Sequence, residues 1–308
     1  MPSGNGSIGG MTTYQGTLVK MPASLDANHD QNRAQPVPVH YNLRLEAPRS
    51  GVGTDPSDVE EVPLHNLLGH RIRLEHTGEY HCILCGRPVK RLFGEGMCYP
   101  CLQNAPEAAE CIMRPELCQG HLGLGRDPEW EEAHHNQPHV VYFAVSSDLK
   151  VGVTRETQVP ARWIDQGAKW AVVLARVPYR QLAGKIEVAL KELYTDRTVW
   201  QRMLKDVPPE YEIDLPRELI RVRHHLEATT EYQELLPFIV TAGEMSPLHL
   251  AYPVLETPEK VRSVNLTRDG LVESRLTGIR GQYLLFEGGA VMNVRRHSGF
   301  RVSCTVEN

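Results

Sequence analysis

The sequence predicts an α+β protein in which strands from both ends of the chain form one antiparallel barrel or sandwich. Apolar and polar residues alternate with period two near the N-terminus and again in the last 70 residues. A cysteine-rich segment lies between these two regions, followed by a stretch with both strand and helix periodicity. We therefore expect a cysteine-rich module and a small α/β domain to be inserted between the two β parts.

The expected organisation has six parts, separated by changes in composition and periodicity. They are a disordered tail (1–12), an N-terminal β part (13–80), a zinc-binding module (81–138), a small α/β domain (139–207), a linker and helix (208–236), and a C-terminal β-meander that packs with the N-terminal strands (237–308). The strands expected in the two β parts are 14–21, 39–46, 67–75, 238–241, 250–255, 260–266, 272–279, 282–286, 290–295 and 300–304.

Composition indicates a globular chain of 308 residues, with 41% hydrophobic and 23% charged residues. The formal net charge of −5 means that overall charge would not steer the protein to nucleic acid, so any such contact needs a local basic patch. The N-terminal residues lack the pattern of a signal peptide, and no run of about 18 apolar residues suggests a membrane span. We expect a reducing, cytoplasmic location and no membrane partner.

Two Cys-x-x-Cys pairs, twelve residues apart, predict a structural zinc site of the zinc-ribbon type. They are Cys82 with Cys85 and Cys98 with Cys101. Each pair lets two thiolates reach one tetrahedral ion from a tight turn. A disulfide framework would suit a small secreted chain, and a redox pair would need one such motif beside a βαβ pattern. A fully coordinated zinc has no open position, so we expect this site to be a scaffold.

The following cysteines and histidines predict a second zinc site. Cys111 and Cys118 are followed by His121, and then by the neighbours His134 and His135. Two thiolates and two imidazoles close a tetrahedral site, and we select Cys111, Cys118, His121 and His134, with His135 as the substitute. The alternative is a pair of buried free cysteines beside surface histidines.

The α/β domain begins with an expected β-hairpin over residues 139–154. One face of this hairpin is apolar, and the other carries Tyr142, Lys150 and Gly152. Gly152 lets a backbone or a ligand approach closely. A helix over 161–166, a strand over 170–177 and a long helix over about 179–204 are expected to follow. The apolar stripe of the long helix consists of Leu182, Ile186, Leu190 and Leu193.

Over roughly residues 14–303 the chain resembles the family known as domain of unknown function 2797. The segments that carry this resemblance are GEYHCILCGR, GMCYPC, RPELCQGHLG, RDPEWEEAH, LKVGVTR, RWIDQGA and GIRGQYLLF. The family name implies no activity.

The segment from Tyr142 to about Lys191 resembles the GIY-YIG nuclease superfamily, most closely its phage-type branch with a Lys-Ile-Gly version of the second motif. Val141-Tyr142-Phe143 stands for the first motif and Lys150-Val151-Gly152 for the second. Arg162 stands for the helix arginine and Glu187 for the metal-binding glutamate. The first motif here lacks its glycine, and Lys150 occupies the place of a tyrosine.

The resemblance implies roles in phosphodiester hydrolysis. Tyr142 is the expected base for the attacking water, and Glu187 is expected to hold Mg²⁺ or Mn²⁺ together with water and phosphate. Arg162 would meet negative charge on the phosphorane, and Lys150 would add a point charge on phosphate. For each residue alone a structural role is the alternative: an amphipathic strand position for Tyr142, and an Arg162–Glu187 salt bridge between helices.

Two functional hypotheses follow from the sequence. The first is a zinc-stabilised, Mg²⁺-dependent endonuclease, and the second is a non-catalytic zinc module that binds nucleic acid or protein through a decayed site. The sequence therefore leaves open whether the protein is an enzyme. No nucleotide cofactor is expected, because the spaced glycines at 120–125 follow no strand and overlap the zinc ligands.

Overall fold

The computed structural model describes residues 10–27, 35–47, 59–195 and 197–307, which form two compact units. Unit 1 comprises Met1–His29, Pro38–Gln103 and Ala251–Asn308, and unit 2 comprises Asp30–Val37 and Asn104–Leu250. Strands of a mixed, mainly antiparallel sheet occur together with separate helices, so the protein is α+β, as predicted. The predicted zinc-binding module, 81–138, contributes residues to both units.

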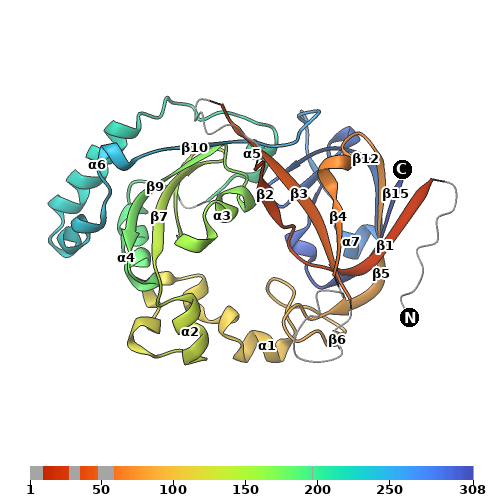
Figure 1. The fold of residues 1–308 in the computed structure, drawn as a ribbon, viewed down its shortest axis with the longest axis horizontal. Coiled ribbons are helices and arrows are strands. Elements are labelled where there is room, and N and C mark those ends of the chain that lie inside the picture. Colours follow the sequence, from red (N-terminus) through yellow and green to blue (C-terminus); the bar gives the residue numbers. More distant parts are fainter. Residues whose placement is uncertain (1–9, 28–34, 48–58, 196, 308) are drawn as a thin grey trace. The chain divides into compact units, whose positions relative to one another are not determined.

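Unit 1 contains a sheet in which strands from both ends of the chain lie side by side (Figure 1). The C-terminal β15 (Phe300–Glu307) lies between β1 (Met11–Leu18) and β5 (Arg71–His81), antiparallel to both. The shared sheet expected from the two β parts is therefore present. The remaining strands of the unit are β2 (Ala23–Leu25), β3 (Val37–Glu46), β4 (Val59–Pro63), β6 (Pro88–Val89), β11 (Arg262–Ser263), β12 (Leu271–Arg280), β13 (Tyr283–Phe286) and β14 (Ala290–Asn293).

Of the predicted barrel or sandwich, the barrel is wrong for the described part of the chain, because the sheet of unit 1 is open. Its strands follow the order β11-β14-β13-β12-β5-β15-β1-β3, and β2 and β4 pair with β3. The β11–β14 pair is parallel, and the other named pairs of this unit are antiparallel. Alternating side chains of β15 form part of the core, among them Val302, Cys304 and Val306.

Unit 2 contains the antiparallel hairpin of β7 (His139–Val145) and β8 (Leu149–Arg155), extended by β9 (Trp170–Val177) and β10 (Leu248–Ala251). Two helices, α3 (Ala161–Asp165) and α4 (Arg180–Leu190), lie on opposite sides of these strands (Figure 1). Every residue of β7 is buried, because helices cover both faces of the strand. The other helices of the unit include α2 (Pro128–His134), α5 (Trp200–Leu204) and α6 (Leu215–Ala228).

The apolar stripe predicted for the long helix faces the main core of unit 2. Leu182, Ile186 and Leu190 pack there with Val141 and Phe143 of β7, and Leu193 packs against the same cluster. The helix itself is shorter than predicted, since α4 ends at Leu190 and α5 is separate. The intervening chain turns back to β8, where the amide of Val151 donates to the carbonyl of Thr195 at 3.1 Å.

Several predicted boundaries in the β parts also differ from the structure. The expected tail 1–12 overlaps β1, which begins at Met11, and residues 1–9 lie outside the described part of the chain. In place of the expected strand 238–241, a 3-10 helix (Thr230–Phe238) ends at Phe238 and Ile239 forms only an isolated antiparallel bridge with Ala175. The expected strand 260–266 contains only β11 before the short helix α7 (Leu266–Asp269). Among the described residues, none of the helices combines the length and apolar character needed to cross a membrane.

Candidate metal centres and polar site

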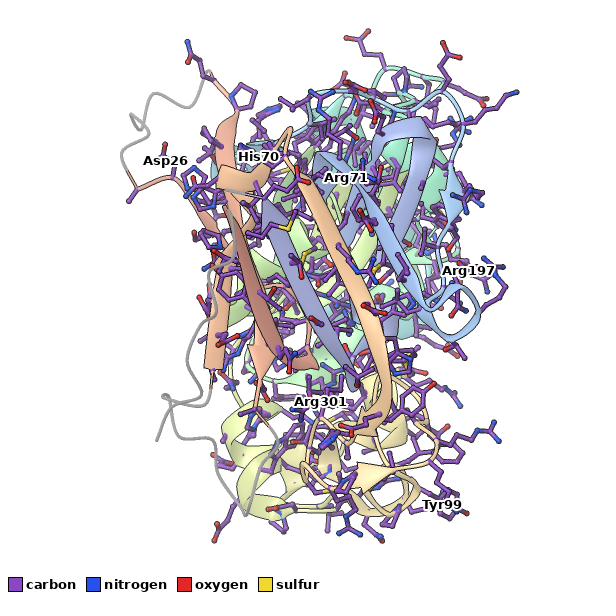
Figure 2. The ribbon with its side chains drawn as sticks, turned by 90° about the vertical axis from the view of Figure 1, so that its right-hand side faces the viewer. Asp26, His70, Arg71, Tyr99, Arg197 and Arg301 are labelled. Carbon is purple, nitrogen blue, oxygen red and sulfur yellow. The ribbon has the colours of Figure 1, made fainter. Side chains whose placement is uncertain are left out.

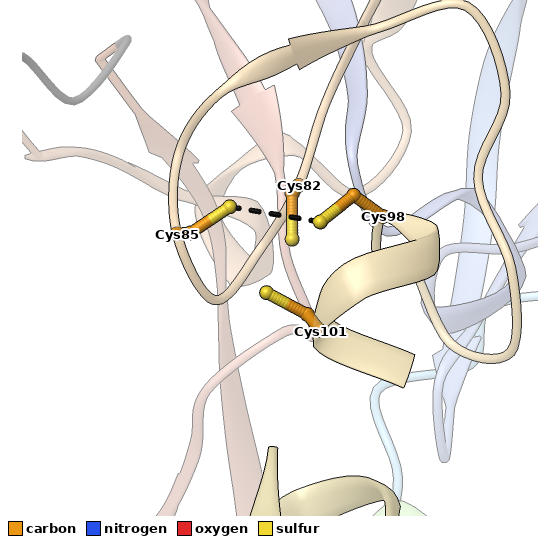
Figure 3. A group of neighbouring side chains, drawn as sticks. All are labelled: Cys82, Cys85, Cys98 and Cys101. Atoms are coloured by element: carbon orange, nitrogen blue, oxygen red, sulfur yellow. Dashed lines mark hydrogen bonds between the residues drawn. The ribbon is translucent and has the colours of Figure 1, made fainter. Parts of the chain in front are cut away.

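The first candidate metal centre lies in unit 1, where the chain places both Cys-x-x-Cys pairs around one point (Figure 3). The tight turn after Cys82 is closed by a hydrogen bond from the Gly86 amide to the Cys82 carbonyl, 2.8 Å. Cys98 immediately precedes α1 (Tyr99–Asn104), so Cys101 lies one turn along that helix. The pattern of turn, loop and helix start thus brings the four thiols together.

The geometry of this group fits a tetrahedral zinc ion. All four sulfur atoms lie within 4.8 Å of one another, and the Sγ atoms of Cys85 and Cys98 are 3.7 Å apart. Zinc–sulfur bonds of about 2.3 Å in a tetrahedron place two sulfurs about 3.8 Å apart. The same four cysteines are free of disulfides. Cys82, Cys85, Cys98 and Cys101 are therefore a set that could hold zinc.

The electrostatics of the four thiols also favour a cation at their centre. Burial and hydrogen bonds to the neighbouring cysteines raise the pKa of Cys101 above its usual range. For Cys85 the burial is outweighed by the backbone hydrogen bond of Arg87 and by the neighbouring thiols, so its pKa falls to about 7. The guanidinium of Arg87 also donates to the Cys85 sulfur at 3.1 Å. Several thiolates cannot form so close together without a compensating cation.

The second candidate metal centre lies in unit 2 and differs from the predicted ligand set. The ligand atoms of Cys111, Cys118, Glu131 and His135 all lie within 4.8 Å of one another. Nδ1 of His135 is 3.5 Å from the sulfur of Cys118 and 4.0 Å from that of Cys111. The substitute histidine of the prediction, His135, is thus in the group.

The two histidines selected first for this site, His121 and His134, are not in the group. Nδ1 of His134 lies 2.8 Å from the carbonyl oxygen of Trp130, and its ring stacks on the Trp130 ring at 4.1 Å. The ring of His121 stacks on Tyr179 at 4.2 Å. Glu131 was missed because no helix was predicted here: on α2 a Glu and a His four residues apart share one helical face.

The two thiols of the second centre shift each other's pKa in opposite directions. The hydrogen bond to Cys118 raises the pKa of Cys111, while the same bond together with His135 lowers the pKa of Cys118 to about 4. A thiolate beside an imidazole is the form in which both groups bind zinc.

The third candidate site is a polar cluster around Tyr142 of β7. Its hydroxyl donates to Oε1 of Gln166 at 3.1 Å, and the side chain is 0% exposed. Gly152 is its cross-strand partner, and a Cβ atom there would lie 2.7 Å from the Tyr142 hydroxyl. The tyrosine ring therefore lies across Gly152, which explains why this strand position has no side chain.

Arg162 and Glu187 both act on this tyrosine. Burial raises the pKa of Tyr142, the charge and hydrogen bond of Arg162 lower it, and the charge of Glu187 raises it. The carboxylate of Glu187 is largely buried and lies 3.5 Å from Nζ of Lys191. Gly152 and Gln166 therefore contact Tyr142 directly, and Arg162 and Glu187 influence the pKa of its hydroxyl.

Lys150, the remaining residue of the predicted catalytic set, has a different neighbour. Its ammonium donates to the hydroxyl of Thr198 at 2.7 Å, and the residue is 4% exposed. The side chain is therefore directed to the segment before α5.

Comparison with known proteins identifies one family. The family model described as "Protein of unknown function (DUF2797)" matches residues 69–302, which confirms the first resemblance over most of its length. No curated protein and no solved structure matches the chain.

Proposed function

Because the chain belongs to the family described as "Protein of unknown function (DUF2797)", a description without an activity, we propose a function from its sites. The protein is a zinc-stabilised nucleic-acid-processing protein. Its Tyr142 cluster is a GIY-YIG-like site that hydrolyses phosphodiester bonds with Mg²⁺ or Mn²⁺. The observation that carries the proposal is that an arginine and a glutamate from two other elements both influence the pKa of the buried Tyr142 hydroxyl.

The chemistry of these three groups suits phosphodiester hydrolysis. Burial keeps the pKa of Tyr142 above its ordinary value, and the charge of Arg162 opposes that shift, so Arg162 favours the deprotonated form that would accept a proton from water. The planar guanidinium also matches the charge that forms on a phosphorane. These two side chains would therefore supply proton transfer and charge stabilisation.

Glu187 is the one carboxylate of this cluster and the residue that would hold the divalent ion. A single carboxylate fits Mg²⁺, which keeps several waters and takes its remaining ligands from substrate phosphate. The bound ion supplies Lewis-acid polarisation of a phosphate oxygen. The ammonium of Lys191, 3.5 Å from Glu187, balances the carboxylate in the free protein.

A nucleic-acid partner is also supported by the surface of the first zinc module. Lys90 and Arg91 are exposed, and the Arg91 guanidinium lies 5.0 Å from the ring centre of Phe93. Tyr99 packs edge-on against Phe93 and is 57% exposed, at the outer border of the module in Figure 2. Cationic and aromatic side chains that alternate on one surface favour single-stranded nucleic acid, where bases stack on the rings.

The test is cleavage of labelled single-stranded, duplex and branched nucleic acids with Mg²⁺ or Mn²⁺. Glu187→Gln removes the metal-binding charge at nearly constant shape, and we expect a rate loss of at least about 100-fold. Glu234→Gln is the matched control, because Glu234 is an exposed residue whose ion pair with Lys185 lies on the surface. Cleavage that survives Glu187→Gln at the control rate would refute the assignment.

A non-catalytic module that binds nucleic acid is the second candidate. The complete burial of Tyr142 favours it, because a buried hydroxyl meets no water in this conformation. The same is true of Lys150, whose ammonium already has Thr198 as an acceptor. Binding without cleavage on every substrate, unchanged in Glu187→Gln, would establish this second function.

A further inference from the structure

The Cys111–Cys118 centre of unit 2 contains the carboxylate of Glu131, which the predicted set of two cysteines and two histidines did not include. Glu131 is 2% exposed and His135 is 3% exposed, and the two are one helical turn apart on α2. Oε2 of Glu131 lies 2.5 Å from Nδ1 of His135, the same nitrogen that faces both sulfur atoms. One imidazole nitrogen thus has three potential acceptors around it.

A hydrogen-bonded pair alone does not account for this arrangement. A single N–H group cannot point at a carboxylate and two sulfurs at once, and burial of a carboxylate beside two thiols is costly without a compensating charge. A cation at the centre satisfies all four donor atoms. Zinc–ligand bonds of about 2.0–2.3 Å place a sulfur and a nitrogen about 3.5 Å apart, which is the separation of Cys118 and His135.

The surrounding loop is shaped to keep the carboxylate at this position. A Cβ atom at Gly125 would lie 2.5 Å from Cγ of Glu131, and one at Gly120 would lie 3.1 Å from its Oε2. The loop that contains both glycines therefore closes directly over the glutamate side chain. The loop also separates the carboxylate from solvent, so that it faces His135 and the metal position.

The net charge of a zinc complex with these four residues has a counter-ion in the structure. Two thiolates and one carboxylate exceed the charge of Zn²⁺ by one negative charge, and Arg180 is half-buried beside the site. Its guanidinium donates to the carbonyl of Cys111 at 3.0 and 3.1 Å and to that of Ile112 at 3.0 Å. The thiol groups of Cys111 and Cys118 interact favourably with this cation.

We propose that the second metal centre is a Cys₂-His-Glu zinc site in which Glu131 is the fourth ligand. When zinc binds, the separation between Glu131 and His135 opens to about 3.3 Å, as two ligands of one tetrahedral ion require. The proposal deepens the zinc-binding part of the proposed function and does not depend on phosphodiester hydrolysis. Metal binding and nucleic-acid cleavage therefore fail or succeed separately.

The experiment measures metal content, metal affinity and the Co²⁺ spectrum of the purified full-length chain. The wild type is expected to hold one ion in each of its two groups. Glu131→Gln keeps the shape and a hydrogen-bond acceptor but is a poor zinc ligand. We expect it to lower the affinity of the second ion by more than about 100-fold, beyond the roughly 10- to 100-fold effect of an outer hydrogen-bonding partner.

Matched variants separate a ligand from a packing residue. Glu132→Gln is the control, since Glu132 is an exposed neighbour that accepts from the Asn136 amide. Glu131→His is expected to retain the second ion with a shifted Co²⁺ absorption band, because it replaces one ligand by another. Retention of the first zinc shows that unit 1 has folded, and thermal unfolding of each variant shows whether unit 2 has folded. If a variant does not fold, the Co²⁺ spectra of His121→Ala and His134→Ala still decide whether either ring is a ligand.

Two results would overturn the proposal. One is a Glu131→Gln protein with two ions, unchanged release to a chelator and an unchanged Co²⁺ spectrum. The other is loss or spectral change of the second ion in His121→Ala or His134→Ala, which would identify one of those rings as the fourth ligand.

Discussion

Gly184→Ala tests whether the second zinc loop is docked on α4. In an ordinary helix interior this substitution stabilises by about 1 kcal/mol. Here the added Cβ would lie 2.2 Å from the backbone nitrogen of Glu116 and 2.4 Å from the carbonyl carbon of Pro115. Both contacts are with backbone, so the 3-10 helix Pro115–Leu117 must move by more than an ångström.

The magnitude follows from two costs. Overpacking at a well-packed contact costs about 1–3 kcal/mol, and displacement of the loop also weakens the charged hydrogen bonds of Arg180, worth roughly 1.5–3 kcal/mol. Against the gain in helix propensity we expect a net destabilisation of about 1–4 kcal/mol. For a unit of this size, each kcal/mol lowers the melting temperature by roughly 2–4 °C.

The assay is thermal unfolding together with the rate at which zinc is lost to a chelator. Gly184→Ala should melt earlier and release the second zinc faster than the wild type. Gly243→Ala is the control, because an added Cβ there meets no atom within 4 Å. If Gly184→Ala is as stable as the wild type or gains the ordinary 1 kcal/mol, with unchanged zinc release, the docking of the loop on α4 is refuted.

Two further perturbations test the first zinc centre and a buried histidine. Cys101→Ser should reduce zinc from two ions to one and leave the second centre filled, as metal analysis would show; loss of both ions would contradict separate sites. Burial lowers the pKa of His139 to about 4, below the unfolded value of about 6.5, so its stabilising effect is complete above pH 6.5 and is lost as pH falls toward 4. We expect the free energy of unfolding in urea to fall between pH 7 and pH 5, and to fall by about 2 kcal/mol less in His139→Gln than in the wild type. Equal decreases in the two proteins would contradict this.

The first metal centre could be predicted from the sequence because its information is local. The two residues between the cysteines of each pair fix the distance between their thiols within one turn. The loop between the pairs then only has to be long enough to bring the second pair back to the first. For the second centre the prediction named the two cysteines of the group and gave His135 only as the substitute, while Glu131 was not predicted. Adjacent positions on a helix point about 100° apart, so whether His134 or His135 faces the sulfurs depends on the start of α2 at Pro128.

The burial of the Tyr142 face could not be predicted from period two alone. Alternation identifies two faces of a strand, but the sequence around β7 does not say that α3 will cover the polar face. In the structure Trp163 of α3 lies over Tyr142, with ring centres 5.9 Å apart. Similarly, α4 ends early because the chain after Leu190 contacts the free edge of β8 through Thr195, a tertiary contact that outweighs local helix propensity.

Helix α4 joins two of these sites through its geometry. Its apolar stripe, Leu182, Ile186 and Leu190, faces the core, and a second stripe runs along the opposite side at intervals of four and three residues. That second stripe consists of Arg180, Gly184 and Glu187.

The first two residues of this second stripe hold the loop of the second metal centre, and the third acts on Tyr142. A helix is stiff over two turns, so the position of Glu187 follows from the contacts of Arg180 and Gly184 with that loop. A zinc ion bound at the second centre would therefore help to fix the position of Glu187 relative to Tyr142, although none of its candidate ligands contacts Tyr142. This connection explains why an interior helix position is occupied by a glycine that costs local helix stability: the loop backbone requires the space that a Cβ would fill.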